Sequence, residues 1–351
     1  MNRLSAWLIA VCLASCPAPA SAASVNGQPY VPLAGWAQAN GLKCVWLKWG
    51  EEIAVTNRST RLVFDRNSRT AQINGVGVLL SFPVAIDRGT PYIAQLDINS
   101  TIRPLIYQPR ADAKSITTIC IDPGHGGRDT GNHTFWRSEK TYTLALALEL
   151  RDQLKTAGFN VILTRSKDTA VELPDRPALA NRARADLFIS LHFNATVTGR
   201  DQVQGPETYC ITPVGASSSN AQGEGAGYGP TPANRCEDKS LLLAYQVEKS
   251  LVHGLGVVDR GVRRARFAVL RDATMPAILI EGGYMTHPAE SKRIYSATNR
   301  RQMAQAMVKG ILAYQKLMSP PPLSRPTIPR PMMPVTTNRA VIRVEPATNW
   351  R

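Results

Sequence analysis

The chain has 351 residues, of which 44% are hydrophobic and 19% are charged, and its formal net charge is +15. These values are typical of globular material long enough for two domains plus tails, and they exclude a mostly disordered polymer. The positive charge favours a polyanionic neighbour such as nucleic acid, anionic lipid or an acidic cell-wall polymer. Because the sequence has no zinc-finger spacing, no aromatic RNA-binding consensus and no basic heptad helix, we expect no nucleic-acid partner.

The N-terminal segment has the pattern of a secretory signal. A short basic start is followed by an apolar run that ends at Ser15, and Ala20-Ser21-Ala22 offers a small-residue cleavage site. Residues 1–22 are therefore predicted to be a signal peptide, which places the mature chain in the periplasm or cell envelope. The alternative is a lipoprotein signal, Leu13-Ala14-Ser15-Cys16, with a lipid anchor on Cys16. No later segment has the ~20 apolar residues of a transmembrane helix.

Four cysteines follow the predicted signal peptide, and their spacing fits no cysteine-based zinc site. Export places them in an oxidising compartment. Cys210 and Cys236 bracket a Gly/Ser-rich segment, so a disulfide that closes it is one hypothesis, and the sequence does not settle the pairing. Cys120 lies within a predicted strand and is expected to be a small buried hydrophobe.

Residues 25–110 are predicted to form a small β-rich domain of short strands and turns. Gly27-Gln28-Pro29-Tyr30-Val31 recurs in form as Gly89-Thr90-Pro91-Tyr92-Ile93, which indicates an internal duplication. Asn74-Gly75 is a hairpin signal between alternating apolar runs. The expected strands include Leu62–Phe64 and Val78–Leu80.

Residues 116–318 are predicted to form a second domain in which strands and helices alternate. This alternation favours an α/β fold with a mostly parallel sheet of about six strands and helices on both faces. Leu146, Leu150 and Leu154 recur at helical spacing and predict one buried helix face. The predicted strands are Ile116–Asp122, Asn160–Thr164, Asp186–His192, Glu207–Ile211, Ala268–Leu270 and Ala277–Glu281, and the predicted helices are Glu139–Thr156, Arg176–Arg184, Ser240–His253 and Asn299–Leu317.

Two segments are expected outside the packed core. Residues 196–238 form a predicted flexible insertion, whose glycine-rich stretch Gly223–Gly229 lacks the strand, helix and lysine of a phosphate-binding loop. Residues 319–351 are proline-rich and are predicted to be a disordered tail.

Four side chains with chemical potential are predicted at the ends of these elements. His125 follows the first strand between glycines, Glu139 opens the next helix, His192 ends a strand, and Glu281 ends another. Carboxyl ends of parallel strands meet at one edge of a sheet, where ligands bind. Taken singly, Glu139 also fits a helix N-terminal carboxylate and His192 a core histidine. The remaining histidines are weaker candidates because they lie in loops or at a helix end: His133, His253 and His287.

The residue types point to a metal-dependent hydrolase. Two histidines and one carboxylate, with a fourth position left to water, make a catalytic rather than a structural zinc site. A second carboxylate is then needed to move a proton from the water to the leaving amine, and we assign this task to Glu281. An acidic side chain directly after four apolar strand residues is costly to bury without a partner, which favours a functional role for Glu281.

Several segments resemble the signatures of the zinc-dependent N-acetylmuramoyl-L-alanine amidases (the type 3 family), in order over about Thr117 to Leu317. The resemblance implies a zinc-exopeptidase-like fold, Zn²⁺ held by His125, Glu139 and His192, and Glu281 as the catalytic carboxylate. It further implies peptidoglycan as substrate, cut between N-acetylmuramic acid and L-alanine. The segments are Ile121–Gly127, Ser138–Lys140, Ser190–Ala195, Asp259–Val262, Phe267–Arg271 and Ile280–Tyr284.

The N-terminal domain is loosely similar to the domain named after the N-terminus of copper amine oxidases. It has no histidine between Val25 and Pro109, so no metal chemistry is expected there. The predicted role is a folded spacer or adaptor.

Two departures from the family pattern concern the substrate groove. Gly282 replaces a larger apolar residue, and His287 stands where asparagine is usual. The insertion falls where some relatives carry a helix that blocks the active site until an activator arrives. An activator protein is therefore a further candidate partner. The alternatives are a zinc carboxypeptidase-like hydrolase of the peptidoglycan stem peptide and a non-catalytic wall-binding protein. The sequence predicts no oligomeric state.

Overall fold

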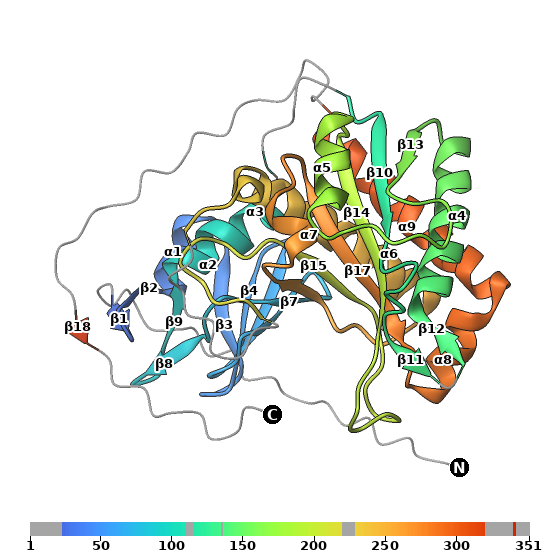
Figure 1. Cartoon of the computed structure of the whole chain (residues 1–351). Coiled ribbons are helices and arrows are strands. Elements are labelled where there is room, and N and C mark those ends of the chain that lie inside the picture. Colours follow the sequence, from blue (N-terminus) through green and yellow to red (C-terminus); the bar gives the residue numbers. More distant parts are fainter. Residues whose placement is uncertain are drawn as a thin grey trace, which may run out of the picture. The chain divides into compact units, whose positions relative to one another are not determined.

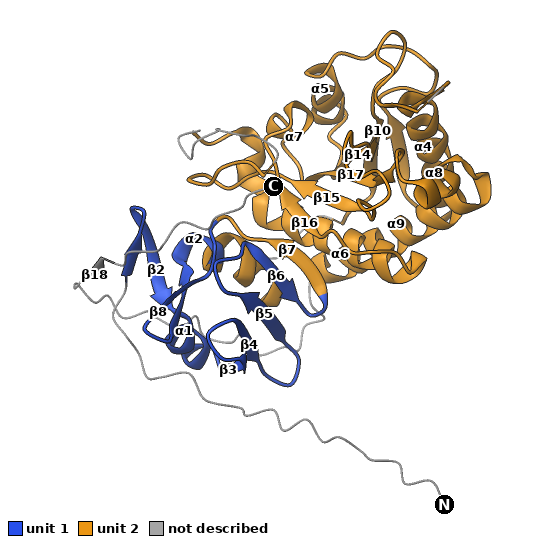
Figure 2. Ribbon diagram, turned by 90° about the horizontal axis from the view of Figure 1, so that it is seen from below, with its two compact units in different colours: residues 1–75, 82–97, 328–351 blue, residues 76–81, 98–327 orange. Residues whose placement is uncertain are grey.

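The computed structural model describes residues 23–107, 109, 115–134, 136–219, 229–319 and 340–341. The predicted signal peptide, the glycine-rich part of the insertion and most of the predicted tail lie outside these residues. The chain divides into two compact units (Figure 2): unit 1 comprises residues 1–75, 82–97 and 328–351, and unit 2 comprises residues 76–81 and 98–327. Within the described residues, no helix combines the length and apolar character needed to cross a membrane.

Unit 1 contains two antiparallel hairpins that match the predicted duplication. β1 (Ala23–Val25) and β2 (Gln28–Pro32) form one hairpin, and β8 (Ala85–Asp87) and β9 (Thr90–Ala94) form the other. Each turn has two residues with positive φ, and the second is a glycine in both. The two hairpins pair through β2 and β9. At the far edge β18 (Ala340–Val341) runs parallel to β1, so these two residues of the predicted tail are in a strand.

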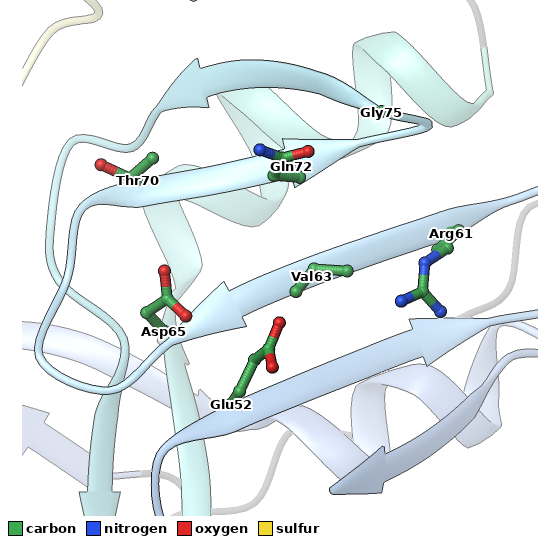
Figure 3. Close-up of a pocket in the computed structure, with 7 residues that line it drawn as sticks. All are labelled: Glu52, Arg61, Val63, Asp65, Thr70, Gln72 and Gly75. Atoms are coloured by element: carbon green, nitrogen blue, oxygen red, sulfur yellow. The ribbon is translucent and has the colours of Figure 1, made fainter. Parts of the chain in front are cut away.

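The other strands of unit 1 form an antiparallel meander with one buried and one polar face. Its strands are β3 (Lys43–Lys48), β4 (Glu52–Thr56), β5 (Arg61–Asp65) and β6 (Thr70–Ile73), and the unit also contains α1 (Leu33–Ala39) and α2 (Gln95–Asp97). Alternate residues such as Ile53, Leu62 and Phe64 are buried. Polar residues of β4, β5 and β6 line an open groove of about 300 Å³ on the other face (Figure 3). None of the four candidate site residues lies in this groove.

Unit 2 contains the mostly parallel sheet that the sequence predicts (Figure 1). The strand order is β13-β10-β14-β17-β15-β16-β7, and of the pairings within it only β15 with β17 is antiparallel. The strands are β7 (Val76–Leu79), β10 (Thr118–Pro123), β13 (Asn160–Leu163), β14 (Leu187–Asn194), β15 (Glu207–Cys210), β16 (Val262–Arg264) and β17 (Ala277–Tyr284), and a separate two-stranded ribbon pairs β11 (His133–Thr134) with β12 (Arg137–Ser138).

Helices cover both faces of this sheet. On one face Ala180 and Leu270 pack with Cys120 and Phe188 of the strands. On the other face, Glu248 accepts a hydrogen bond from Thr208 of β15. The first group of helices is α5 (Asp175–Arg182) and α7 (Ala268–Arg271), and the second includes α4 (Glu139–Thr156), α6 (Glu237–Leu255) and α9 (Ala297–Met318), with α3 (Arg103–Ile106), α8 (Pro288–Tyr295), η1 (Ile98–Ile102) and η2 (Pro232–Cys236) elsewhere in the unit.

The predicted helix face of α4 is confirmed, whereas one predicted strand is wrong. Leu146, Leu150 and Leu154 are all buried. Ala268–Leu270 forms most of the short helix α7 instead of a strand. A short apolar run cannot be assigned to strand or helix by periodicity alone, because it is too short to display either period. β16 takes the place of the missing strand in the sheet.

The boundary between the units differs from the predicted one. β7 carries the apolar run assigned to the N-terminal domain, yet it belongs to unit 2. Val78 pairs with Val262 of β16, and the backbone N–H of Gly77 donates to Oδ2 of Asp259 at 2.7 Å. A Cβ on Gly77 would lie 3.3 Å from the Cα of Gly261, so glycine permits this close approach. These contacts connect residues nearly two hundred positions apart. The pattern of neighbouring residues in the sequence therefore could not predict that β7 belongs to unit 2.

The hypothesis of a disulfide between Cys210 and Cys236 is wrong. The Sγ of Cys210 lies 3.7 Å from the carbonyl oxygen of Arg263, and the Sγ of Cys236 lies 3.7 Å from that of Thr274, with no bond between the two sulfurs. Flanking a loop does not bring two Cα atoms within the separation of ~7 Å that a disulfide requires. Cys120 is buried as predicted, and burial raises the pKa of its thiol to about 12.

Candidate active site

His125 is delivered by a glycine-rich loop at the end of β10. Its own φ is +61°, in the left-handed region. A Cβ on Gly124 would lie 2.3 Å from the ring of His192, so glycine is required for the two elements to approach. The guanidinium of Arg165 donates to the carbonyl oxygen of Gly124 at 2.8 Å and holds the loop. The glycine before His125 therefore serves the packing of a second imidazole.

Three side chains from separate elements converge at this loop. The Nε2 of His125 lies 3.2 Å from Oε2 of Glu139, and the Nδ1 of His192 lies 2.9 Å from Oε1 of the same carboxylate. One ligand atom from each residue can be chosen so that all three lie within 4.8 Å of one another. The imidazole rings meet edge to face at a centroid distance of 4.8 Å. The strand-end residues predicted as a metal site are thus brought together.

Glu139 is almost fully buried, and each of its oxygens has two polar neighbours. Besides the two imidazoles, the backbone N–H groups of Phe193 and Asn132 donate to Oε1 and Oε2 at 3.0 and 2.9 Å. Burial by itself would raise the pKa of Glu139. The contacts with His125 and His192 outweigh it and hold the pKa well below its usual range. The carboxylate is therefore held in its ionised form and in one position.

Asp129 completes the orientation of His125 and was not predicted. Its Oδ2 lies 2.9 Å from Nδ1 of His125, on the side of the ring away from Glu139. Burial would lower the pKa of His125, but the contacts with Glu139 and Asp129 raise it overall. A carboxylate that fixes the ring orientation is the usual partner of a metal-binding histidine. The detectable signal was an acid four residues beyond the histidine, in the same loop.

A buried ion pair supports the carboxyl ends of β10 and β14. Oδ1 of Asp122 accepts a hydrogen bond from Nη1 of Arg176 at 2.8 Å, and its Oδ2 accepts one from the hydroxyl of Ser190 at 2.8 Å. Thr164 donates to the same carboxylate at 2.6 Å. Arg176 also donates to the carbonyl oxygen of His125, so this network fixes the loop that carries His125 to the ends of β10 and β14.

Glu281 lies beside the cluster in a contrasting environment. It is the Cα partner of His192 between β14 and β17, and of Glu207 between β15 and β17. Within the described residues its Oε2 is buried and has no hydrogen-bond partner. Burial, followed by the negative charges of Glu139 and Glu207, raises the pKa of Glu281 well above its usual value. A carboxylate of this kind is suited to proton transfer.

The donor set fits a zinc ion. Two imidazole nitrogens and one carboxylate oxygen are common zinc ligands, and three protein ligands leave a position for water or substrate. The side chains of His125 and His192 are 22% and 18% exposed, so the cluster is open to solvent on one side. The separate carboxylate of Glu281 stands beside that cluster.

The weaker histidines lie elsewhere, as the sequence indicated. His133 is in β11 and exposed, and His253 is exposed near the end of α6. His287 caps α8, its Nδ1 accepting the backbone N–H of Glu290 at 3.4 Å. His287 therefore caps a helix, a position for which asparagine is also favoured.

The unusual Gly282 is explained by its neighbours. A Cβ at this position would lie 2.9 Å from Cε1 of Phe193 and 3.0 Å from Sδ of Met303. These two side chains occupy the space that a larger apolar residue would need. The departure therefore concerns packing beneath Glu281.

Comparisons with known proteins agree with the geometry. Residues 119–313 match the family model described as N-acetylmuramoyl-L-alanine amidase, and residues 15–106 match the one described as copper amine oxidase N-terminal domain. N-acetylmuramoyl-L-alanine amidase AmiC of Neisseria meningitidis serogroup B is 33% identical over 270 residues, covering 66% of this chain and 64% of that protein.

Two further similarities cover slightly more than half of this chain. N-acetylmuramoyl-L-alanine amidase LytC of Bacillus subtilis is 32% identical over 199 residues, which cover 57% of this chain and 36% of that protein. The crystal structure of the N-acetylmuramoyl-L-alanine amidase from Clostridium difficile 630 aligns at 34% identity with a TM-score of 0.49, covering 58% of this chain and 98% of that one. The chain thus spans less than two thirds of the length of the two curated relatives named here.

Proposed function

We propose that this chain, which belongs to the N-acetylmuramoyl-L-alanine amidase family, is a zinc-dependent hydrolase of the amide bond between N-acetylmuramic acid and L-alanine in peptidoglycan. The observation that carries the proposal is the pairing of two unlike carboxylates at one sheet edge. Glu139 is ionised and joined to two imidazoles, whereas Oε2 of Glu281 has no hydrogen-bond partner among the described residues. Amide hydrolysis needs both an anchored ligand set and a carboxylate that exchanges protons.

In this proposal His125, Glu139 and His192 hold zinc. A zinc ion in such a site polarises a carbonyl and lowers the pKa of water toward ~7. Asp129 keeps the His125 ring in the orientation for binding, because it contacts the nitrogen on the far side. Asp122 and Arg176 hold the loop that carries His125.

Glu281 is proposed to transfer the proton. Its carboxylate accepts a proton from the attacking water and returns it to the nitrogen of L-alanine, which leaves as a neutral amine. Because its Oε2 has no hydrogen-bond partner among the described residues, this oxygen is available to accept the proton and to return it. The leaving amine would otherwise depart poorly.

We further propose that the mature chain acts outside the cytoplasm. The N-terminal pattern of a basic start, an apolar run and Ala20-Ser21-Ala22 supports export, and the proposed substrate belongs to the cell wall. A soluble form is favoured over a lipid anchor on Cys16. An activator protein stays a prediction, because the glycine-rich part of the insertion lies outside the described residues.

The test is digestion of purified sacculi by the zinc-loaded protein, with mass analysis of the soluble products. We expect free stem peptides that begin with L-alanine and glycan strands that stay intact, and a chelator should abolish both. The Glu281→Gln variant is the matched control for contaminating hydrolases.

Two outcomes would contradict the proposal. Products shortened only between amino acids would identify a carboxypeptidase-like hydrolase. If the protein binds sacculi in the presence of zinc but releases no product, it is a wall-binding protein.

A further inference from the structure

Next to Glu281, on the side away from the histidines, lies a buried acid. Glu207 opens β15 and is the Cα partner of Glu281 in the antiparallel pairing of β15 with β17. Directly opposed residues have Cα atoms about 4.5–5.5 Å apart and side chains on the same face of the sheet. Glu207 is only 2% exposed. The row of functional side chains therefore continues from His192 through Glu281 to Glu207.

Glu207 binds two arginines. Its Oε1 accepts hydrogen bonds from Nε of Arg260 and, at 2.9 Å, from the hydroxyl of Tyr284. Nη2 of Arg263 lies 3.5 Å from the same oxygen. The hydroxyl of Tyr209 donates to Oε2 at 2.5 Å. Although burial would raise the pKa of Glu207, these partners lower it overall, so the acid is ionised.

The arginines carry more positive charge and more donors than Glu207 can use. Two guanidinium groups face the carboxylate of Glu207, which is one more than a single ion pair needs. In the part of the chain that the structure describes, Arg260 bonds to Glu207 only through Nε, and Arg263 only through Nη2. The Nε of Arg263 is buried without an acceptor. A purely structural role would need one arginine, because one is enough to neutralise one carboxylate.

Both arginines are partly open to solvent and held in position. Their side chains are 28% and 26% exposed. The guanidinium of Arg260 lies over the ring of Tyr284 at 5.3 Å from the centroid. A Cβ on Gly205 would lie 2.2 Å from the carbonyl oxygen of Val258 and 3.1 Å from Cγ of Arg260, so the glycine lets its loop pack closely against the segment that carries Arg260. The donors are therefore preorganised for a ligand.

We propose that Arg260 and Arg263 bind a carboxylate on the peptide side of the scissile bond, on the residue that follows L-alanine. The inference rests on the proposed function. Guanidinium groups bind carboxylates through paired N–H donors. The carboxyl group of N-acetylmuramic acid carries no charge in the substrate, because it forms the scissile amide. An anionic group close to that amide therefore belongs to the peptide.

The spacing agrees with this assignment. β15 and β16 lie one and two strand positions beyond β17, and neighbouring strands are about 4.8 Å apart. An extended peptide spans about 3.3–3.6 Å per residue. A carboxylate one residue beyond L-alanine therefore falls within reach of the long arginine side chains when the scissile amide lies beside Glu281.

The test compares two synthetic substrates that differ at one group. Both consist of N-acetylmuramic acid joined to a dipeptide that begins with L-alanine. The residue after L-alanine has a free α-carboxylate in one substrate and a carboxamide in the other. For the zinc-loaded mature protein we expect kcat/KM to be about 10-fold higher for the carboxylate, with the difference mainly in KM. Arg263→Gln and Arg260→Gln should reduce this preference to about 2-fold or less. Arg301→Gln, which removes an exposed charge from α9, is the matched control and should retain it.

The two substrates keep the test independent of folding. Arg260→Gln removes a donor from the buried Glu207, so a general loss of activity in that variant says nothing about recognition. The test of recognition is therefore the ratio of kcat/KM for the two substrates. Arg263→Gln is the more informative variant, because the contact of Arg263 with Glu207 is longer and its loss disturbs Glu207 less. Equal kcat/KM for both substrates in the unmodified protein, or a preference retained in both variants, would overturn the subsite. Failure to cut either substrate, together with inactive sacculus digestion, would overturn the proposed function as well.

Discussion

The surroundings of Glu139 and Glu281 differ although both acids lie at the same edge of the sheet in unit 2. Every oxygen of Glu139 has two polar neighbours, and its pKa is lowered. Oε2 of Glu281 has no hydrogen-bond partner within the described residues, and its pKa is raised. When two acids in one site are shifted in opposite directions, their roles separate. The first fits a fixed ligand, and the second fits a proton carrier.

The difference arises from what the backbone offers each acid. Glu139 opens a helix, whose dipole favours an anion there, and the backbone N–H groups of Asn132 and Phe193 donate to its carboxylate. Glu281 lies within a strand, whose backbone groups are already paired with β14 and β15. The four predictions below test this contrast, starting with the largest expected effect.

Removal of a proposed ligand should have the largest effect. His125→Ala and His192→Ala are each expected to lose stoichiometric zinc and at least about 10³-fold in activity, because two donors hold the ion poorly. Elemental analysis of the purified variants measures the zinc. His253→Ala, at the exposed end of α6, is the control and should keep one zinc per chain. One zinc per chain in both ligand variants would refute the proposed ligand set.

Glu281→Gln should separate turnover from metal binding. We expect kcat to fall by about 10²–10⁴-fold, because the side-chain amide of glutamine cannot accept the proton from water. The zinc content should stay unchanged. The control is Glu172→Gln, an exposed acid paired with Arg128. Unchanged turnover would remove Glu281 from the proposed mechanism, and lost zinc would make it a ligand.

Asp129→Asn should weaken zinc binding without abolishing it. The loss of the charged partner at Nδ1 of His125 is expected to lower zinc affinity by about 10–100-fold. Competition with a chelator of known affinity measures the change. Asp152→Asn, in an exposed pair with Arg151, should leave the affinity as it was. If both variants bind zinc equally well, Asp129 does not orient the ligand.

The buried acid Glu248 of α6 extends the contrast to stability. Burial raises its pKa, although the hydrogen bond from Thr208 opposes this, and its Oε1 has no partner among the described residues. The folded state therefore holds the proton more tightly than the unfolded state does. Stability is lost as the pH rises above the unfolded pKa of about 4.3, and it stays lost above the folded pKa.

Glu248→Gln should remove this penalty. The variant is expected to be more stable than the unmodified protein by roughly 1–3 kcal/mol at pH 8 and equally stable near pH 4. Denaturant unfolding at the two pH values measures the difference, and Glu172→Gln serves again as the exposed control. A variant that is less stable at pH 8 would show that the carboxylate has a stabilising partner when folded.

Part of the site could be predicted because its residues sit at recognisable ends of elements. His125 follows the apolar strand β10, His192 and Glu281 lie near the carboxyl ends of β14 and β17, and Glu139 opens a helix with a clear apolar face. Parallel alternation then brings strand ends to one edge. Asp129 had a local signal in the histidine loop, but its contact depends on the positive φ of His125, which the pattern does not display.

Other features had no such signal. The network of Glu207 with Arg260 and Arg263 joins residues more than fifty positions apart through the order of β17, β15 and β16. The strand β7 was predicted, but its membership of unit 2 depends on pairing with β16. The wrong disulfide and the helix α7 have the same origin, since each short segment is compatible with several environments.

Residue order alone determined the alternation of strands and helices, the polar residues at their ends and therefore the four side chains of the proposed chemistry. Periodic burial is a local property, because neighbouring residues on one face share one environment. Tertiary structure alone decided which oxygens of the acids are satisfied, how the second carboxylate is isolated, and where surplus arginine donors lie. These properties depend on the distances between strands that the chain brings together from remote positions.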